Sequence, residues 1–329
     1  MAILDAYSEL RGSLDGNVFL DEPMNRHTSF HIGGPVALYV ECASVHDLHV
    51  CFEVATAEQM PWAITGKGSN LLVSDKGWRG MVLTLTGQFK EIVAPEPPPG
   101  AGQTAEAAQA AQVPPPPQEA SFKQSVVAGG GVILATLVQT AFKHGYSGFE
   151  FAVGIPGTLG GALAMNAGTA TEGIGSIVSK LTVYRPQVGL VRIQGSELPW
   201  DYRASGIPEG DIIVEAELWA RPGNVVHIQA KMEAALNLRK AAQPLTVPSA
   251  GSVFRNPPGA SVGKMVDDLG LKGYRIGGAE VSSKHANFIV NNGSATAADV
   301  LAIIMEVRRR VKDEYGTELQ TEIRFIGFE

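Results

Sequence analysis

The chain has 329 residues, of which 45% are hydrophobic and 18% charged. This length allows two or three domains with a sizeable core, so a wholly disordered chain is excluded. Lys plus Arg number 26 against 33 Asp plus Glu, a net charge of −7, which excludes a nucleic-acid binder unless the basic residues cluster.

No segment predicts export or membrane insertion. The N-terminus lacks the basic and apolar regions of a signal peptide. The uncharged stretches 125–142 and 151–171 contain too many glycines for a lipid-exposed helix. Cys42 and Cys51 form no disulfide framework, and no Cys/His spacing predicts a metal site. We therefore expect a cytoplasmic protein without bound metal.

Strands and helices alternate along the chain, which predicts an α+β or α/β fold. Short apolar runs between turn residues predict strands at 37–40, 61–65, 81–85, 125–128, 181–184, 190–193, 212–218 and 287–290. Apolar residues at helical spacing predict helices at 44–59, 132–144, 226–240, 260–269 and 296–315. The last of these has a capping box, Thr296 and Asp299, and places the basic run 308–312 in its final turns, where cations are favourable.

Two segments stand apart from this pattern. Residues 94–120 are rich in Pro, Ala and Gln, which predicts a solvated loop inserted between two strands, with a proline-motif partner site as the weaker alternative. Residues 318–328 alternate in polarity, which predicts a strand with Ile323 and Phe325 on one face and Glu322 on the other. Glu322 fits either a catalytic carboxylate or an exposed strand face.

Two glycine-rich segments, GKGSNLL (66–72) and GIPGTLGGALAMNAG (154–168), indicate a ligand site. Their backbone amides suit a diphosphate, and their glycines allow close approach of a flat or anionic ligand. A helix beginning after Pro156 would add N-terminal amides. Neither segment has the GxGxxG or Walker pattern. Turns and close internal packing are the alternatives.

Two polar residues lie in further candidate segments. Ser252 in SAGSVFRNP has no GxSxG context, so a proton donor is favoured over an acyl nucleophile, with a turn serine as the alternative. Arg203 in DYRAS is suited to a bidentate contact with a carboxylate. An ordinary surface arginine is the alternative there.

In their order, these segments resemble the UDP-N-acetylenolpyruvoylglucosamine reductase family, flavoenzymes of peptidoglycan precursor synthesis. The matching segments are NRHTSFHIGGPV (25–36), GKGSNLLVSDKGWRG (66–80), SGFEFAVGIPGTLGGALAMNAG (147–168), YRAS (202–205), QPLTVPSAGSVFRNP (243–257), LKGYRIGGAEVSSKHANFIVN (271–291) and TEIRFIG (321–327). Some members insert a loop whose tyrosine covers the substrate diphosphate. Here Leu218 leads directly to the helix at Val226, so the chain resembles the shorter type II subclass.

The resemblance implies an α+β fold: the two-subdomain FAD-binding fold of the vanillyl-alcohol oxidase-like (PCMH-type) flavoproteins, with a C-terminal α+β substrate domain. It places an N-terminal extension at 1–24, FAD-binding subdomain 1 at 25–88, subdomain 2 at 89–224 and the substrate domain at 225–317. The strand at 318–329 is expected to return near the active site.

The resemblance also implies the site residues. Non-covalent FAD is expected to contact Gly66, Lys67, Gly68, Ser69, Asn70, Leu71, Gly130, Gly154, Ile155, Pro156, Gly157, Gly160, Gly161, Asn166, Ala167 and Gly168. The catalytic positions are Arg203, Ser252 and Glu322. The substrate contacts are Tyr202, Lys240, Asn256 and His285.

The implied activity is reduction of the enolpyruvyl ether of UDP-GlcNAc to UDP-N-acetylmuramate in a ping-pong scheme with NADPH as reductant. Besides this small-molecule substrate, no obligatory protein partner, nucleic acid or membrane is expected. Two alternatives are a related FAD-dependent alcohol oxidase and a catalytically inactive sugar-nucleotide-binding homologue.

Overall fold

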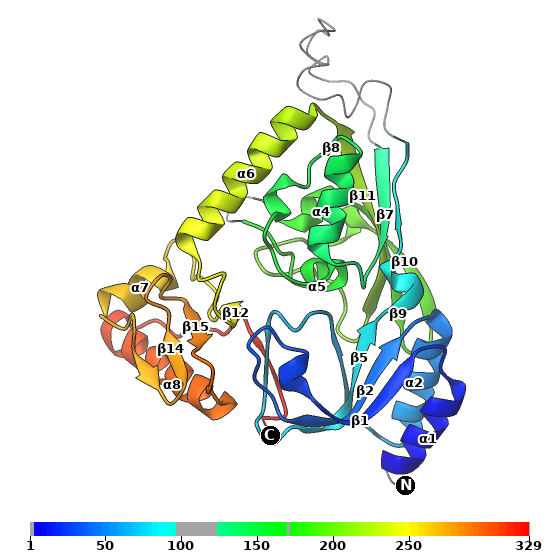
Figure 1. Ribbon diagram of the computed structural model, residues 1–329, viewed down its shortest axis with the longest axis horizontal. Coiled ribbons are helices and arrows are strands. Elements are labelled where there is room, and N and C mark those ends of the chain that lie inside the picture. The colour runs from blue at the N-terminus through cyan, green and yellow to red at the C-terminus, as the bar shows by residue number, and fades with distance from the viewer. Residues whose placement is uncertain (1–2, 97–123, 170–171, 329) are drawn as a thin grey trace, which may run out of the picture. The chain divides into compact units, whose positions relative to one another are not determined.

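The computed structural model describes residues 3–96, 124–169 and 172–328 (Figure 1). These residues form two compact units. Unit 1 consists of Met1–Glu41, Glu53–Thr84 and Arg239–Glu329, and unit 2 consists of Cys42–Phe52 and Leu85–Leu238. Each unit is described separately below.

Unit 1 is built on three sheets within the described residues. The first has the order β1 (Asn17–Pro23), β2 (Pro35–Cys42), β5 (Trp78–Leu85), β3 (Trp62–Thr65). The second, fully antiparallel, has the order β12 (Ser249–Ser252), β15 (Phe288–Asn291), β14 (Ala279–Val281), β13 (Arg275–Ile276). The third pairs β16 (Arg324–Ile326) in parallel with β4 (Leu71–Val73). The helices are α1 (Ile3–Ser13), α7 (Val262–Asp268), α8 (Ala297–Tyr315) and the 3-10 turn η1 (Met24–Arg26).

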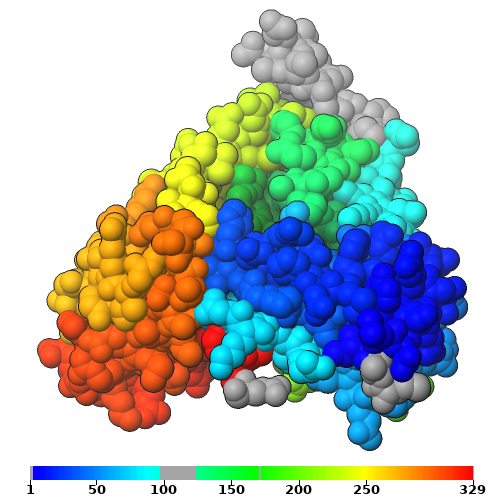
Figure 2. Space-filling model, turned by 60° about the horizontal axis from the view of Figure 1, so that its bottom comes forward, coloured from blue at the N-terminus to red at the C-terminus, as the bar shows by residue number. Residues whose placement is uncertain are grey.

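Helix α8 has the start, the buried face and the end that its sequence predicts. Thr296 and Asp299 form the expected capping box, and Gly316 ends the helix in the left-handed conformation at φ 65°. Its apolar side chains lie in the core of unit 1 with residues of β14 and β15. Its outer surface is open to solvent (orange-red in Figure 2), and there Arg309 and Arg310 pair with Glu306. Two residues of the basic run are therefore paired within the helix, and Lys312 pairs with Glu318 just beyond its end.

Unit 2 is built on one antiparallel sheet in the order β10 (Gly189–Gln194), β9 (Val178–Arg185), β11 (Ile212–Pro222), β7 (Gln124–Gly129), β6 (Ile92–Val93), with β8 (Tyr146–Ser147) on β11. Helices α4 (Leu134–Lys143) and α5 (Leu159–Ala164) pack on this sheet through one apolar cluster (Figure 1). The 3-10 turns are η2 (Gly87–Lys90), η3 (Glu150–Ala152), η4 (Ile174–Ile177) and η5 (Gly195–Glu197).

Helices α2 (Val45–Ala57) and α6 (Val225–Ala242) continue from one unit of the chain into the other. Gly223 and Asn224 alone separate β11 from α6, which confirms the expected lack of an inserted loop. Asn224 begins α6 by accepting hydrogen bonds at Oδ1 from the amides of Val226 and His227.

The predicted helices and strands are confirmed from 37–40 to 296–315, and most ends differ by no more than two residues. The exceptions are β5 and β9, which begin three residues earlier than predicted, and β11, which ends four residues later. The strand predicted over 318–328 is wrong in extent, because only Arg324–Ile326 forms one and Thr321 makes an isolated bridge to Phe254. Residues 1–24 were expected only as an extension, yet they contain α1 and β1. Most of the Pro/Ala-rich insert, from residue 97 on, lies outside the described residues. The expected domain boundaries stay a prediction.

The described residues contain neither a disulfide bond between Cys42 and Cys51 nor a membrane-spanning helix. Cys42 and Cys51 are free thiols, as expected, with their Sγ atoms 3.9 Å apart. None of the helices in the described ranges has both the length and the apolar character needed to cross a membrane.

Candidate active site

Ser252 and Glu322 lie on neighbouring backbone segments of unit 1. Ser252 is the last residue of β12, and the carbonyl of the next residue, Val253, accepts a hydrogen bond of 2.7 Å from the amide of Glu322. Two residues further along, the amide of Arg255 donates to the carbonyl of Gln320 at 2.9 Å. Two residues predicted to be catalytic are thus brought together by main-chain pairing.

Asn70, a predicted flavin contact, belongs to the same cluster. Its Nδ2 donates to the carbonyl of Glu322 at 3.0 Å, and its own carbonyl accepts from the amide of Arg324 at 2.9 Å. Strand β4 begins at the following residue and pairs with β16. The GKGSN turn and the segment carrying Glu322 therefore hold each other in place on both sides of Asn70.

The GKGSN turn keeps backbone amides available for a ligand. Gly68 has φ +59°, and a Cβ there would approach the carbonyl oxygen of His27 to 2.1 Å, so close packing explains this glycine. Within the described residues, the amides of Lys67 and Gly68 donate no hydrogen bond. Successive amides without an acceptor in a tight turn fit the diphosphate of FAD.

Close packing explains two glycines of the second glycine-rich segment, Gly160 and Gly168, and also Gly130, a further predicted flavin contact in unit 2. A Cβ on Gly130 would lie 2.0 Å from the carbonyl oxygen of Ile213, one on Gly168 would lie 1.9 Å from that of Glu172, and one on Gly160 would lie 3.0 Å from that of Gly130. Internal packing, left open as an alternative, is the physical reason for these three glycines.

The expectation that α5 offers its N-terminal amides to a phosphate is wrong. The amides of Leu159, Gly160 and Gly161 already donate to Val132 O, Gly130 O and Thr158 Oγ1. Gly161 nevertheless fits a close ligand, because its backbone is exposed and a Cβ would meet only Thr158 Oγ1, at 3.5 Å. The fold does not require a glycine there, so a flat group such as the flavin ring is a reason for one.

Arg203 lies on a tight turn of unit 2, where Asp201 and Ala204 form an isolated bridge. Its φ is +55°, an uncommon conformation for a side-chain-bearing residue. Asn166 holds this turn, since its Nδ2 donates to Asp201 O at 2.8 Å while its Oδ1 accepts from the amide of Gly175 at 2.9 Å. The Arg203 guanidinium lies over the ring of Tyr202, 5.0 Å from the ring centroid. Asn166 thus has a structural role that the sequence did not reveal.

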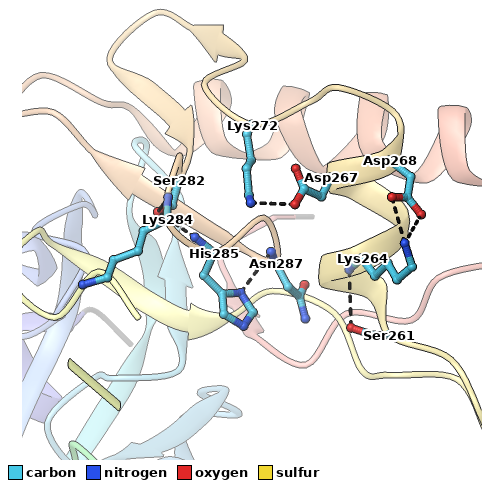
Figure 3. Close-up of polar contacts among 9 residues, drawn as sticks. All are labelled: Ser261, Lys264, Asp267, Asp268, Lys272, Ser282, Lys284, His285 and Asn287. Carbon is cyan, nitrogen blue, oxygen red and sulfur yellow. Dashed lines mark hydrogen bonds and ion pairs between the residues drawn. The ribbon is translucent and has the colours of Figure 1, made fainter. Parts of the chain in front are cut away.

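Three predicted substrate contacts lie in unit 1. Asn256 is exposed, and its Oδ1 accepts at 3.0 Å from the amide of Val262, the first residue of α7. Lys240 is exposed near the end of α6, and its carbonyl accepts from Lys284 Nζ. His285 accepts at Nδ1 from the amide of Asn287 at 3.2 Å, and its own amide donates to Ser282 Oγ (Figure 3). Asn256 Nδ2, Lys240 Nζ and His285 Nε2 take no part in these hydrogen bonds, so these atoms can contact a ligand.

Comparison with known proteins decides the family. The model of the UDP-N-acetylenolpyruvoylglucosamine reductase C-terminal domain matches residues 243–326, and that of an FAD binding domain matches residues 118–193. The UDP-N-acetylenolpyruvoylglucosamine reductase of Caldanaerobacter subterraneus is 39% identical over 95% of both chains. That of Heliobacterium modesticaldum is 41% identical over 95% of this chain and 91% of its own. The chain belongs to the UDP-N-acetylenolpyruvoylglucosamine reductase family.

A solved structure of this reductase family gives the same result. The crystal structure of UDP-N-acetylenolpyruvylglucosamine reductase from Thermus caldophilus has a TM-score of 0.74 and 31% identity, covering 95% of this chain and 99% of that chain. The expected α+β fold is confirmed, and so is FAD as the cofactor. The chain is an FAD-binding oxidoreductase. Because Ser252 and Glu322 lie in unit 1 and Arg203 lies in unit 2, the convergence of all three stays a proposal.

Arg255 is a site candidate of this reductase that the sequence reading missed. Its Nε is inaccessible to solvent and has no hydrogen-bond partner among the described residues. Burying part of a charged group without a partner is costly. Arg255 lies three residues after Ser252 in SVFRNP, but the sequence does not show that its Nε is buried.

We expect Arg255→Met to weaken binding of UDP-N-acetylmuramate roughly tenfold or more, because a partly buried guanidinium gains from an anionic partner. Titration of the flavin absorbance with UDP-N-acetylmuramate measures the dissociation constant. Arg308→Met, at an exposed position of α8, serves as the control. Unchanged affinity, or loss of FAD in place of weaker nucleotide binding, contradicts the expectation.

His285 is expected to make the stability of the reductase depend on pH. Burial lowers its pKa, and the cation of Lys272 lowers it further, against a hydrogen bond with its own backbone that raises it. Because the folded-state pKa lies below the unfolded value, the unfolded chain binds more protons near that value, and stability rises with pH. This contribution is full above about pH 6.5, the unfolded value for histidine, and is lost as the pH falls through the folded pKa.

Urea unfolding at pH 7.5 and 5.5 measures this effect. His285→Gln is expected to lose less stability than the unmodified chain between the two pH values, and His227→Gln, at an exposed position of α6, to lose as much. Equal losses in the unmodified chain and His285→Gln would show that another group sets the pH dependence.

Proposed function

We propose that this chain reduces UDP-N-acetylglucosamine enolpyruvate to UDP-N-acetylmuramate in peptidoglycan precursor synthesis, with NADPH as the reductant. NADPH binds first and leaves as NADP⁺, and the sugar nucleotide then takes its place, which is a ping-pong scheme. We place the reaction in the cytoplasm, where thiols such as Cys42 and Cys51 stay reduced. The names of the relatives and the flavin-binding match support the reaction type.

FAD, when bound without a covalent link, supplies a hydride acceptor and donor. The amides of Lys67 and Gly68 would hold its diphosphate, and the exposed backbone at Gly161 would lie against its flat ring. Asn70 fixes the first of these segments to the one that carries Glu322. The GKGSN turn and Glu322 are thereby held at a fixed distance from each other.

Three side chains would serve the substrate. Hydride addition at C3 of the enolpyruvyl group leaves negative charge on C2 and on the carboxylate, so the reaction needs a cation and a proton donor. Arg203 would neutralise the carboxylate, and Ser252 would protonate C2. Glu322, with its Oε2 inaccessible to solvent, would share a proton with the developing enol, which is helped by a dry environment.

One observation carries the proposal. The amide of Glu322 donates to the carbonyl of Val253, the residue after Ser252. The proposed proton donor, Ser252, and the carboxyl group of Glu322 are therefore carried by two backbone segments that are bonded to each other. A surface serine and a surface glutamate without a joint task would need no such arrangement.

Anaerobic flavin spectroscopy tests the proposal. The purified protein should be yellow, NADPH should bleach it, and UDP-N-acetylglucosamine enolpyruvate should restore the colour. A colourless, folded protein contradicts the proposal. Return of the colour with oxygen and an alcohol, but not with the sugar nucleotide, favours the alcohol oxidase. Binding of the sugar nucleotide to a flavin that NADPH cannot bleach favours the inactive binder.

A further inference from the structure

Asn287 is a buried polar residue to which no role in the reaction has been assigned. Its side chain is 4% exposed and makes two hydrogen bonds to one residue, Phe254. The Oδ1 atom accepts from the Phe254 amide at 3.0 Å, and Nδ2 donates to the Phe254 carbonyl at 2.8 Å. In addition, the carbonyl of Asn287 accepts from the amide of Val253 at 2.8 Å. One asparagine thus satisfies three of the four backbone groups of the two residues that follow Ser252.

The fourth backbone group leads to Glu322. The carbonyl of Val253 accepts from the Glu322 amide at 2.7 Å, so the main chain of Val253 is bonded to Asn287 on its N–H side and to Glu322 on its C=O side. Residue 253 has no freedom to rotate without breaking one of these bonds. The orientation of the adjoining Ser252, and its spacing from Glu322, follow from this connection.

We propose that Asn287 is a positioning residue that aligns Ser252 with Glu322 for protonation of the substrate. The inference rests on the proposed function, since it presumes that Ser252 is the proton donor. Asn287 acts through the backbone of Val253 and Phe254 and touches no reacting atom.

Asn287 is itself held in a structured turn. Its amide donates to His285 Nδ1, and Ser282 Oγ accepts from the amides of Lys284 and His285 (Figure 3). Strand β15 begins at the next residue, Phe288, which pairs with Ser252. We call the two side-chain hydrogen bonds from Asn287 to Phe254 the clamp. The clamp lies beside the pair of strands, β12 and β15, that carries Ser252.

The clamp requires a carboxamide. An aspartate would keep an acceptor for the Phe254 amide, but it would place a second oxygen against the Phe254 carbonyl, where Nδ2 now donates. A serine would leave at least one of these buried backbone groups without a partner. Either change disturbs the segment after Ser252 while leaving Ser252 and Glu322 in place as residues.

The chain offers a matched control at the far end of β15, the strand that follows Asn287. Asn291, at the other end of β15, is 5% exposed. Its Nδ2 donates to the Phe30 carbonyl at 2.9 Å, and its Oδ1 accepts from the amides of Gly293 and Ala295. It is buried and bonded to a similar degree, but none of these bonds goes to the segment 252–254. Loss of stability alone should therefore be similar for the two asparagines.

The test measures both half-reactions of the FAD-loaded enzyme by stopped-flow absorbance, together with thermal stability and the dissociation constant for UDP-N-acetylmuramate. Asn287→Asp and Asn287→Ser are compared with Asn291→Ser and Ser252→Ala. We expect both Asn287 variants to reduce with NADPH within about twofold of the unmodified enzyme and to bind UDP-N-acetylmuramate within about threefold. Their reoxidation by substrate should slow roughly 10- to 100-fold, the order of loss caused by small misplacement of a catalytic group. Asn291→Ser should lose stability with both half-reactions kept within about twofold.

The outcomes separate the two hypotheses. If Ser252→Ala slows reoxidation selectively and the Asn287 variants do not, the positioning role is overturned and the proposed function stands. If the Asn287 and Asn291 variants lose reoxidation equally, the effect is one of stability and the positioning role is again overturned. If Ser252→Ala slows both half-reactions alike, the proposed function fails, and the inference fails with it. Where Asn287→Asp does not accumulate as folded protein, Asn287→Ser is judged by the same criteria.

Discussion

Replacing Ser252 by alanine is expected to leave reduction by NADPH within about twofold and to slow reoxidation by UDP-N-acetylglucosamine enolpyruvate roughly 10²- to 10⁴-fold, the usual range for loss of a positioned proton donor. The substitution should not disturb the fold. Ser252 is held by main-chain pairing of β12 with Phe288 of β15, and alanine retains that pairing. Only the hydroxyl is removed, so the two half-reactions should separate sharply.

Stopped-flow absorbance of the flavin measures both steps. Ser249→Ala is the control, because Ser249 lies on the same short strand β12 and pairs with Val290 of β15. It should change neither half-reaction by more than about twofold. Equal loss of both half-reactions in Ser252→Ala, or retention of both, is incompatible with a proton donor at this position.

Replacing Arg203 by lysine is expected to slow reoxidation roughly 10²-fold, although the positive charge is kept. Lysine cannot reproduce the planar pair of donors that a guanidinium presents to a carboxylate, and removal of one oriented donor from a reacting oxyanion costs about 10²- to 10³-fold. The turn that carries Arg203 is held by Asn166 through Asp201, so a lysine there would start from the same backbone position. Arg203→Met should be at least as slow as Arg203→Lys.

The reductive half-reaction again provides the contrast, since NADPH oxidation does not involve the enolpyruvyl carboxylate. Arg192→Lys, at an exposed position of β10 in the same unit, should behave as the unmodified enzyme. Full activity of Arg203→Lys would mean that charge alone suffices at residue 203, and full activity of Arg203→Met would remove Arg203 from the site.

Much of the fold could be predicted because local patterns and tertiary packing agree. In α8 the cap, the apolar face and the final glycine all give the same boundaries. In 318–328 they disagree. The alternation of polarity predicts a long strand, but the first half of this segment pairs with the 253–255 backbone and only the second half with β4. No local sequence pattern indicates that the pairing partner changes from the 253–255 segment to β4.

The candidate site was predictable as residue types and not as contacts. The glycine-rich segments predicted a ligand site. The sequence could not show that Gly160 is needed for packing against Gly130, whereas Gly161 has open space beside it. Asn287 and Arg255 lie within segments that the family resemblance covers. Their roles depend on burial and on hydrogen bonds to distant residues, which single-sequence patterns do not contain.

The pairing of β16 with β4 constrains how the chain acquires its active form. Asn70 and Glu322 are 252 positions apart, so during synthesis the GKGSN turn emerges long before its partner exists. Such distant pairings form slowly because loop closure must precede the contacts that reward it. A polypeptide that ends before residue 320 would lack both Glu322 and the strand that β4 requires. Premature termination close to the C-terminus should therefore yield a protein that cannot retain FAD, and a purification tag is better placed at the N-terminus.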